Sequence, residues 1–309
     1  MPARLIINAD DFGLTSGINR AILELHQAGV LTSATLMATG PAFDEAARIA
    51  RDNPTLGVGC HLTFVDGLPV SHPQDIPTLL GADGKTFRPS VADFAQAALR
   101  GAIRPADLAR ETQAQIQKLQ RAGIDVTHVD SHKHTHLFPS VASTVLHIAQ
   151  RCGISAARNP FEPTWSTQLS TSSRIRRLQL RILDRFRPSF ARVSNEQAPS
   201  FHIPDGTLGL AATGTLDAPT LTRLLTHLPP DSLFELCCHP GYNDADLDLQ
   251  VTRLRQTRDI ERNALLAVIP EIIQHPDAPQ LIHYGNLGIA GHQRASRHFA
   301  PPNGFEKVL

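Results

Sequence analysis

The segment THVDSHKHTHLFP, residues 127–139, carries four histidines and one aspartate at alternate positions. On an extended strand such side chains point to one side, so the spacing predicts that all five face the same space. Imidazole and carboxylate groups bind divalent metal ions and transfer protons. The segment is therefore the first candidate for a catalytic centre. Its five polar residues are His128, Asp130, His132, His134 and His136.

Other candidate residues follow short apolar runs elsewhere in the chain. In NADDFG, residues 8–13, Asp10 and Asp11 come directly after such a run. A carboxylate buried at a strand end needs a partner such as a cation, so this pair favours a functional role over simple helix capping. His61 is the second-to-last residue of the run GVGCHL, His239 stands in CHPGY, and Arg158 ends ISAAR.

These residues are predicted to meet at one edge of a sheet. In parallel α/β sheets and barrels, ligands bind at the carboxyl ends of the strands. One aspartate of the pair, His61 and His132 would then converge from distant parts of the sequence. Two imidazoles and one carboxylate form a ligand set for a catalytic divalent metal with open positions. For His128 we favour a structural role as a core histidine.

Apolar runs alternate with helical patterns along most of the chain, which predicts a parallel sheet, open or closed. Residues 63–90 are rich in Pro, Gly and Asp and are expected to form a long loop. The expected strands are residues 5–9, 33–39, 56–62, 126–132, 154–158, 233–239 and 281–285. The expected helices are residues 16–29, 41–53, 105–123 and 139–152.

Residues 162–200 interrupt this alternation with a basic, helix-forming insertion. Apolar residues recur at helical spacing, which predicts an amphipathic helix with a solvated basic face. The alternative is a cap that favours an acidic or lipid-linked substrate. The arginines are Arg174, Arg176, Arg177, Arg181, Arg185 and Arg187, and the apolar positions are Ile175, Leu178, Ile182 and Phe186.

The composition suits a single globular domain over residues 1–309. Hydrophobic residues make up 41% of the chain, enough for a sizeable core. Lys+Arg and Asp+Glu both number 29, so no general attraction to nucleic acid or to an anionic membrane is indicated. No apolar stretch reaches the roughly 18 residues of a membrane span, and no secretory pattern is present. We expect a cytoplasmic protein with reduced cysteines. The composition is compatible with a homodimer.

The motifs NADDFG, GCHL, DSHKHTHLFP and ELCCHPGY, in this order, resemble those of the YdjC-like carbohydrate deacetylases, which include chitooligosaccharide deacetylases. The resemblance extends from LIINADDFG to RQTRDIE, residues 255–261. LTSATLMATGPAFDEA and the HKH run also resemble the hopanoid-biosynthesis branch of the family. The resemblance implies an irregular (β/α) barrel of about seven parallel strands.

The resemblance further implies hydrolysis of an N-acetyl group on an amino sugar or glycolipid. It assigns the ligands of one divalent ion to Asp11, His61 and His132. The ligand set favours Zn²⁺, while Mg²⁺, Co²⁺ and Mn²⁺ stay open. The first aspartate, Asp10, would then be the general base, although the two aspartates could exchange roles.

The remaining candidates also receive roles from the resemblance. His239 would protonate the departing amine, and Arg158 would keep Asp10 ionised and oriented. His134 and His136 would line the substrate cleft or support the metal ligands. The rival hypotheses are another barrel metallohydrolase, such as an amidohydrolase or phosphoesterase, and an inactive sugar-binding homologue.

Overall fold

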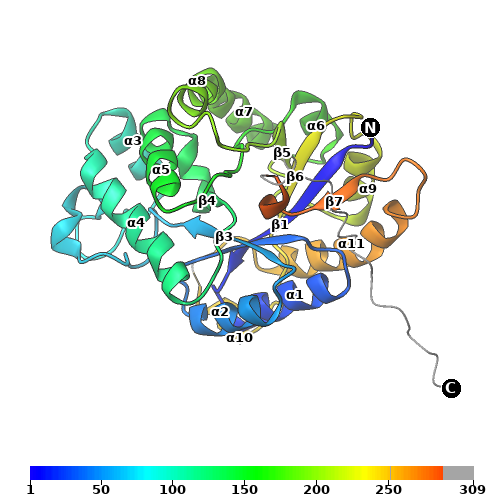
Figure 1. Ribbon diagram of the computed structural model, residues 1–309, viewed down its shortest axis with the longest axis horizontal. Helices are drawn as coiled ribbons and strands as arrows, with labels where there is room; N and C mark the ends of the chain where they lie inside the picture. Colours follow the sequence, from blue (N-terminus) through cyan, green and yellow to red (C-terminus); the bar gives the residue numbers. More distant parts are fainter. Residues whose placement is uncertain (251, 288–309) are drawn as a thin grey trace.

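The computed structural model describes residues 1–250 and 252–287 as one sheet surrounded by helices (Figure 1). The sheet has seven strands in the order β4-β3-β2-β1-β6-β5, with β7 paired to β1, and every strand pair is parallel. This arrangement confirms the predicted α/β fold, an irregular barrel of about seven strands. The strands are β1 (Arg4–Phe12), β2 (Ser33–Leu36), β3 (Gly57–Leu62), β4 (Val129–Ser131), β5 (Gly206–Leu208), β6 (Leu233–Cys238) and β7 (Gln280–Ile282).

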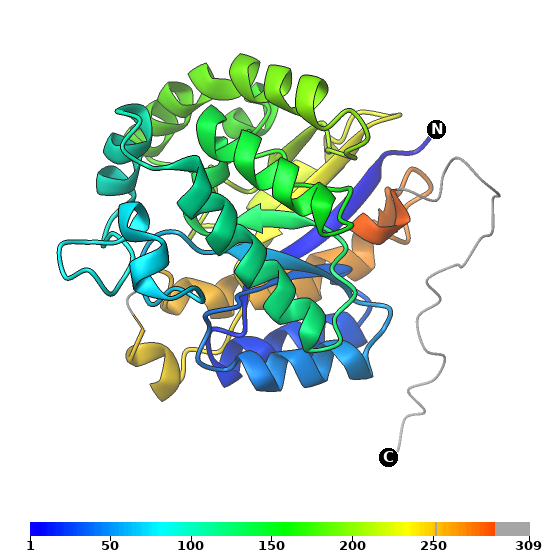
Figure 2. The ribbon, with the colours of Figure 1, turned by 60° about the vertical axis from the view of Figure 1, so that its left-hand side comes forward.

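Helices enclose the sheet from several sides, as the two ribbon views show (Figures 1 and 2). The helices α1, α2 and α10 lie below the sheet in Figure 1, and α7 and α8 lie above it. The helices are α1 (Ser16–Gln27), α2 (Phe43–Asp52), α3 (Val91–Leu99), α4 (Pro105–Arg121), α5 (Pro139–Arg151), α6 (Thr164–Leu169), α7 (Arg174–Leu183), α8 (Arg187–Gln197), α9 (Ala218–Thr226), α10 (Ala245–Asp248) and α11 (Gln256–Ile272). Short 3-10 turns are η1 (Pro73–Asp75), η2 (Pro77–Leu79), η3 (His132–Leu137), η4 (Asp184–Phe186) and η5 (Tyr284–Asn286).

Strand β1 is the centre of the molecule and pairs with β2, β6 and β7. Its side chains alternate between two environments, as expected for a strand. Leu5, Ile7 and Ala9 join the main apolar core, whereas Ile6 packs in a small cluster with Tyr284. The face that carries Ile6 continues at its carboxyl end into polar residues, so the helices cover the apolar face while the other face leads to the candidate site.

The end of β1 departs from regular pairing. Ala9 pairs with Ala34 and Phe12 with Leu36, so one extra residue of β1 is accommodated between these pairs. Within this bulge Asp11 has a φ of 64°, a left-handed conformation that aspartate tolerates better than most residues. Bulges of this kind re-aim side chains next to active sites. Asp10 and Asp11 therefore do not simply alternate across the sheet.

Residues 63–90 form a long connection, as predicted, and α4 fixes it in place. The buried carboxylate of Glu111 accepts hydrogen bonds from the amides of Val70 and Ser71, both at 2.9 Å. Asp107, on the same helix, accepts from the amide and hydroxyl of Thr78 at 3.0 and 2.8 Å. These bonds satisfy backbone groups that a loop would otherwise bury without partners.

Two predictions about local structure are wrong. Residues 154–158 form no strand and make only isolated bridges, from Ala157 to Val129 and from Ala156 to His202, while β5 supplies the seventh strand instead. The histidine segment also does not continue as a strand beyond Ser131. It turns into η3, in which Lys133 and His134 have positive φ values of 55°. This turn ends the alternation that the even spacing suggested.

No described helix is both long and apolar enough to cross a membrane.

Candidate active site and metal centre

Asp10 lies at the carboxyl end of β1, and both of its carboxylate oxygens accept hydrogen bonds. Arg158 contacts both carboxylate oxygens, with Nη2 2.6 Å from Oδ1 and Nη1 2.8 Å from Oδ2. The Asn8 amide donates a further hydrogen bond of 3.0 Å to Oδ1. Arg158 is completely buried and also contacts Asp130 at 2.8 Å and Glu235 at 2.5 Å. Such a buried cation holds several carboxylates in one geometry.

Asp11 is buried as deeply, but its carboxylate is only half paired. Its Oδ2 accepts a hydrogen bond of 2.6 Å from Nη2 of Arg258, on α11. Its Oδ1 has no hydrogen-bond partner among the described residues. This oxygen instead faces Nδ1 of His132 at 3.3 Å and Nε2 of His61 at 3.6 Å. One carboxylate oxygen and two imidazole nitrogens therefore converge on one point.

His61 is oriented for such a contact by Asp130. Its Nδ1 lies 2.8 Å from Oδ1 of Asp130, while Nε2 points toward Asp11. The other oxygen of Asp130 is fixed by Thr35 at 3.1 Å and by Arg158. A histidine that donates one ring nitrogen to a carboxylate while the other binds a metal is a common arrangement in metal sites.

The histidine segment divides into residues with different surroundings. His132 reaches Asp11, and its ring meets that of His61 edge-on with centroids 5.5 Å apart. His128 stacks on Tyr284 at 3.8 Å, as expected for a core histidine. His134 and His136 each keep one buried ring nitrogen without a hydrogen-bond partner among the described residues.

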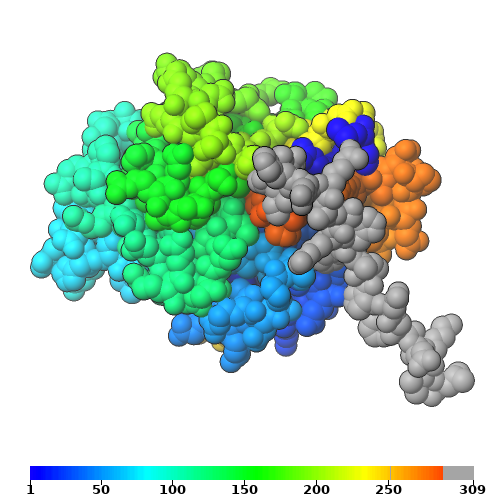
Figure 3. All heavy atoms as spheres, in the orientation of Figure 1, coloured from blue at the N-terminus to red at the C-terminus, as the bar shows by residue number. Residues whose placement is uncertain are grey.

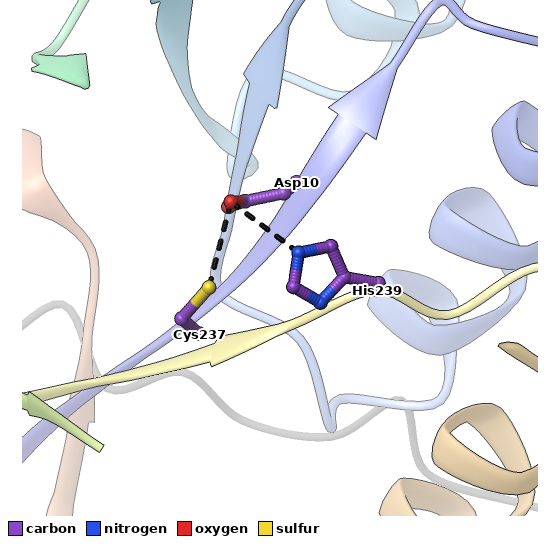
Figure 4. Close-up of side chains that lie close together, drawn as sticks. All are labelled: Asp10, Cys237 and His239. Carbon is purple, nitrogen blue, oxygen red and sulfur yellow. Dashed lines mark hydrogen bonds and ion pairs between the residues drawn. The ribbon is translucent and has the colours of Figure 1, made fainter. Parts of the chain in front are cut away.

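His239 directly follows β6 and approaches Asp10 together with Cys237 (Figure 4). Its Nε2 lies 3.8 Å from Oδ2 of Asp10, and the Cys237 thiol is 3.4 Å from the same oxygen. On the other side of the ring, Nδ1 lies 3.8 Å from Oε2 of Glu261, which also accepts the His239 amide at 2.6 Å. Glu261 thereby fixes the backbone of His239 and places a carboxylate near its ring.

The local charges set the protonation of both aspartates. Burial opposes ionisation of Asp10, but the positive charges of Arg158, His61 and His239 together outweigh it and hold the pKa of Asp10 well below its ordinary value. Burial likewise opposes ionisation of Asp11, and Arg258 with the nearby imidazoles holds the pKa of Asp11 well below its ordinary value. Both carboxylates are therefore anionic at neutral pH.

The pKa values of the histidines in the site are shifted in opposite directions. Burial alone would lower the pKa of His61, but the neighbouring carboxylates, chiefly Asp130, raise it to about 9. Burial also opposes the charge on His239, and Glu261 raises the pKa of His239 above its ordinary value. Burial dominates for His128 and His136 and lowers their pKa values to about 3 and about 4.

Within residues 1–250 and 252–287, three groups of side chains bring ligand atoms close enough to hold a metal ion. The group of Asp11, His61 and His132 contains the buried carboxylate oxygen without a partner. The other two groups both use Asp10, whose two oxygens already accept hydrogen bonds from Arg158. The donor set and the unpaired oxygen of the first group therefore fit a divalent cation best.

Comparisons with known proteins show the family of this chain. The family model described as "YdjC-like protein" matches residues 4–269. A carbohydrate deacetylase from Brevibacillus brevis is 32% identical over 285 residues, which cover 92% of this chain and all of that protein. The chain belongs to the YdjC-like family.

Two further relatives extend the comparison of this YdjC-like chain. A carbohydrate deacetylase from Geobacillus stearothermophilus is 35% identical and covers 80% of this chain and 83% of its own. A crystal structure from Enterococcus faecalis, of a protein named for cellobiose-phosphate cleavage, superposes with a TM-score of 0.73 at 25% identity. It covers 93% of this chain and 99% of that one.

The structure adds residues to the site that sequence reasoning missed. Arg258 and Glu261 both come from α11, which follows β6 and lies far along the chain from β1. They occupy the buried face of α11 together with Leu265 and Val268. Two charged residues at positions where an amphipathic helix should be apolar were the available signal. Glu235, the third carboxylate on Arg158, lies inside an otherwise apolar run of β6.

Proposed function

We propose that this chain is a metal-dependent carbohydrate deacetylase that hydrolyses the N-acetyl group of an amino sugar and releases acetate. Two of the relatives above, from Brevibacillus and Geobacillus, are named carbohydrate deacetylases, and both align over most of their length. The observation that carries the proposal is the unpaired Oδ1 of Asp11, which faces His61 and His132 beside the paired carboxylate of Asp10.

Asp11, His61 and His132 are proposed as the ligands of one divalent ion, Zn²⁺ or Mg²⁺, with Co²⁺ or Mn²⁺ as alternatives. A divalent ion at this position would polarise the amide carbonyl and lower the pKa of a water molecule. Binding it requires the loss of a proton from His61, whose pKa of about 9 keeps the ring protonated at neutral pH in the absence of metal.

The proton transfers are proposed for Asp10 and His239. Asp10 is anionic and accepts a proton from the attacking water, while Arg158 holds the carboxylate in place. The water oxygen adds to the carbonyl carbon, and the carbon–nitrogen bond then breaks. His239, whose pKa is raised by Glu261, donates a proton to the departing nitrogen. The products are acetate and the free amino sugar.

His134 and His136 are proposed to contact the sugar. Each presents a ring nitrogen that is buried and has no hydrogen-bond partner in the described part of the chain. The Ser131 hydroxyl fixes His136 through a hydrogen bond of 2.6 Å to Nδ1, so its Nε2 is held in one direction. Neutral imidazoles suit hydroxyl groups, since each can donate or accept a hydrogen bond.

The rival metallohydrolases generally use two metal ions with a bridging ligand. A second ion beside Asp10 would have to displace the ion pair with Arg158, in which both oxygens are engaged at 2.6 and 2.8 Å. The polar cluster around Asp10 therefore favours one metal ion per chain. Elemental analysis that finds two ions per chain would favour the rival reaction class.

The direct experiment removes metal with a chelator, restores single divalent ions and measures acetate release. The substrates are N-acetylglucosamine oligomers and glycolipids that carry an N-acetylated sugar. We expect acetate release that is lost on chelation and recovered with a divalent ion. An absence of acetate from every substrate with metal-loaded protein would support the inactive, sugar-binding alternative. The single domain, the homodimer, the cytoplasmic location and the hopanoid branch stay predictions.

A further inference from the structure

Helix α7 exposes an apolar stripe to solvent. Ile175, Leu178 and Ile182 are 71%, 58% and 48% exposed, and no residue of α7 is buried. Their spacing places them on one side of the helix. Single exposed apolar residues are ordinary on protein surfaces, whereas a continuous stripe along a helix indicates an interaction site. The segment lies at the upper edge of the molecule in Figures 1 and 3.

A row of exposed arginines runs beside this stripe. Within residues 1–250 and 252–287, none of these arginines forms an ion pair with a carboxylate. The formal charge of the whole chain is zero, so this positive charge is a local feature. At about 100° per residue, the arginines lie along one flank of the apolar stripe. They are Arg174, Arg177, Arg181 and Arg185, the last in η4 directly after α7.

The opposite side of the segment is anchored to the protein. Arg176 donates from Nε and Nη2 to the carbonyl oxygen of Leu210 at 3.2 and 2.8 Å. Arg187 donates to the carbonyl oxygen of Glu162 at 2.9 Å. The arginines of this segment therefore divide into an inner pair with partners and an outer row without them. These anchors keep the stripe and the outer row facing outward.

We propose that α7 docks the protein on an anionic phospholipid surface. A helix with an apolar stripe and a basic flank lies in the plane of a membrane interface, with its apolar side chains among the lipids and its cations at the headgroups. Long arginine side chains can reach the headgroups while their aliphatic parts stay near the apolar region. A second copy of the chain fits less well, because paired α7 helices would bring two unneutralised arginine rows together.

Co-sedimentation of the full chain with vesicles tests the proposal without relying on activity. Vesicles of phosphatidylcholine alone are compared with vesicles that also contain phosphatidylglycerol, at low and high salt. We expect binding to the anionic vesicles only, weakened by salt. The Arg177→Gln/Arg181→Gln variant should weaken this binding by about fivefold for each arginine, or about 25-fold together.

A second variant removes the stripe and keeps the charges. Ile175→Ser/Leu178→Ser/Ile182→Ser should weaken binding by about tenfold or more for each side chain. These positions are exposed, so folding should be retained, and circular dichroism checks this. Ile260→Ser is the matched control, since Ile260 is 47% exposed on α11, outside the stripe. It should bind like the unaltered chain.

Three results would overturn the proposal. The unaltered chain could fail to sediment with anionic vesicles. The stripe and arginine variants could bind as tightly as the Ile260→Ser control. Light scattering could show a dimer that the stripe variant converts to a monomer, which would assign the stripe to a contact between copies of this chain.

Discussion

The two consecutive aspartates of β1 have opposite surroundings. Both oxygens of Asp10 are engaged by Arg158, while Asp11 has one oxygen held by Arg258 and one that accepts no hydrogen bond from the described part of the chain. Both carboxylates are buried, and both have a pKa well below the ordinary value. The two aspartates therefore differ in whether a carboxylate oxygen is left to bind a cation, and not in their charge. An anion with a free, buried oxygen beside two imidazoles is suited to a cation, whereas a fully paired anion is suited to a fixed position.

The largest expected effect concerns the ligands beside Asp11. His61→Ala and His132→Ala should each lose most of the bound metal and nearly all deacetylase activity. The loss of affinity should exceed the roughly 10–100-fold that follows removal of a group that only supports a ligand. Metal content by elemental analysis and acetate release measure both effects. If both variants keep one ion per chain, the ligand assignment is wrong.

Variants of the residues around Asp10 should react more slowly while they still bind the metal. His239→Ala removes the proposed proton donor, and loss of such a group costs ~10²–10⁴-fold in rate. The loss should be much smaller with an activated acetyl ester, since its leaving group departs without a proton. The comparison is the ratio of kcat for amide and ester substrates. An equal loss with both would contradict the role of His239 as an acid.

A substitution of Glu261 should have a smaller effect, and it tests the role of His239 specifically. Glu261 raises the pKa of His239, and a general acid is active only below its pKa. Glu261→Gln should therefore lower this pKa and move the alkaline limit of kcat/KM to lower pH. Glu271→Gln is the control, because Glu271 is exposed on the same helix. An unchanged pH profile, with folding confirmed by thermal unfolding, would show that Glu261 is structural only.

The smallest effect is expected for substitution of His134, which is assigned neither to the metal site at Asp11 nor to the proton transfers at Asp10. His134→Ala should retain the metal and most of kcat, because its ring is assigned to the sugar and not to the ion. The expected change is a rise in KM of about fivefold, the equivalent of one hydrogen bond of ~1 kcal/mol. Steady-state kinetics and metal content decide it. A loss of bound metal would place His134 among the ligands.

The sequence predicted the elements that carry the site better than the contacts within it. The alternation of apolar runs and helices indicated the parallel sheet, and the carboxyl ends of its strands indicated where the polar residues meet. Residues 154–158 have a strand-like composition, but they pair only through isolated bridges. Short apolar runs do not reveal how many partners a strand finds in three dimensions.

The contacts of the site depend on backbone detail that spacing does not reveal. Even spacing suggested that five side chains share one face, but the left-handed conformations of Lys133 and His134 end the strand at Ser131. The bulge at Asp11 is equally local. Arg258 and Glu261 come from a distant helix, and only their position on its apolar face could have identified them.

The most direct test compares Asp10→Asn with Asp11→Asn in a metal titration that follows both bound metal and acetate release. Asparagine matches the shape of aspartate and tolerates the positive φ at Asp11, so the backbone should be retained. Asp10→Asn should bind metal normally and stay inactive at any metal concentration. Asp11→Asn should bind metal weakly and regain part of its activity with excess metal. If Asp10→Asn is the variant that excess metal rescues, the two aspartates have the reverse roles.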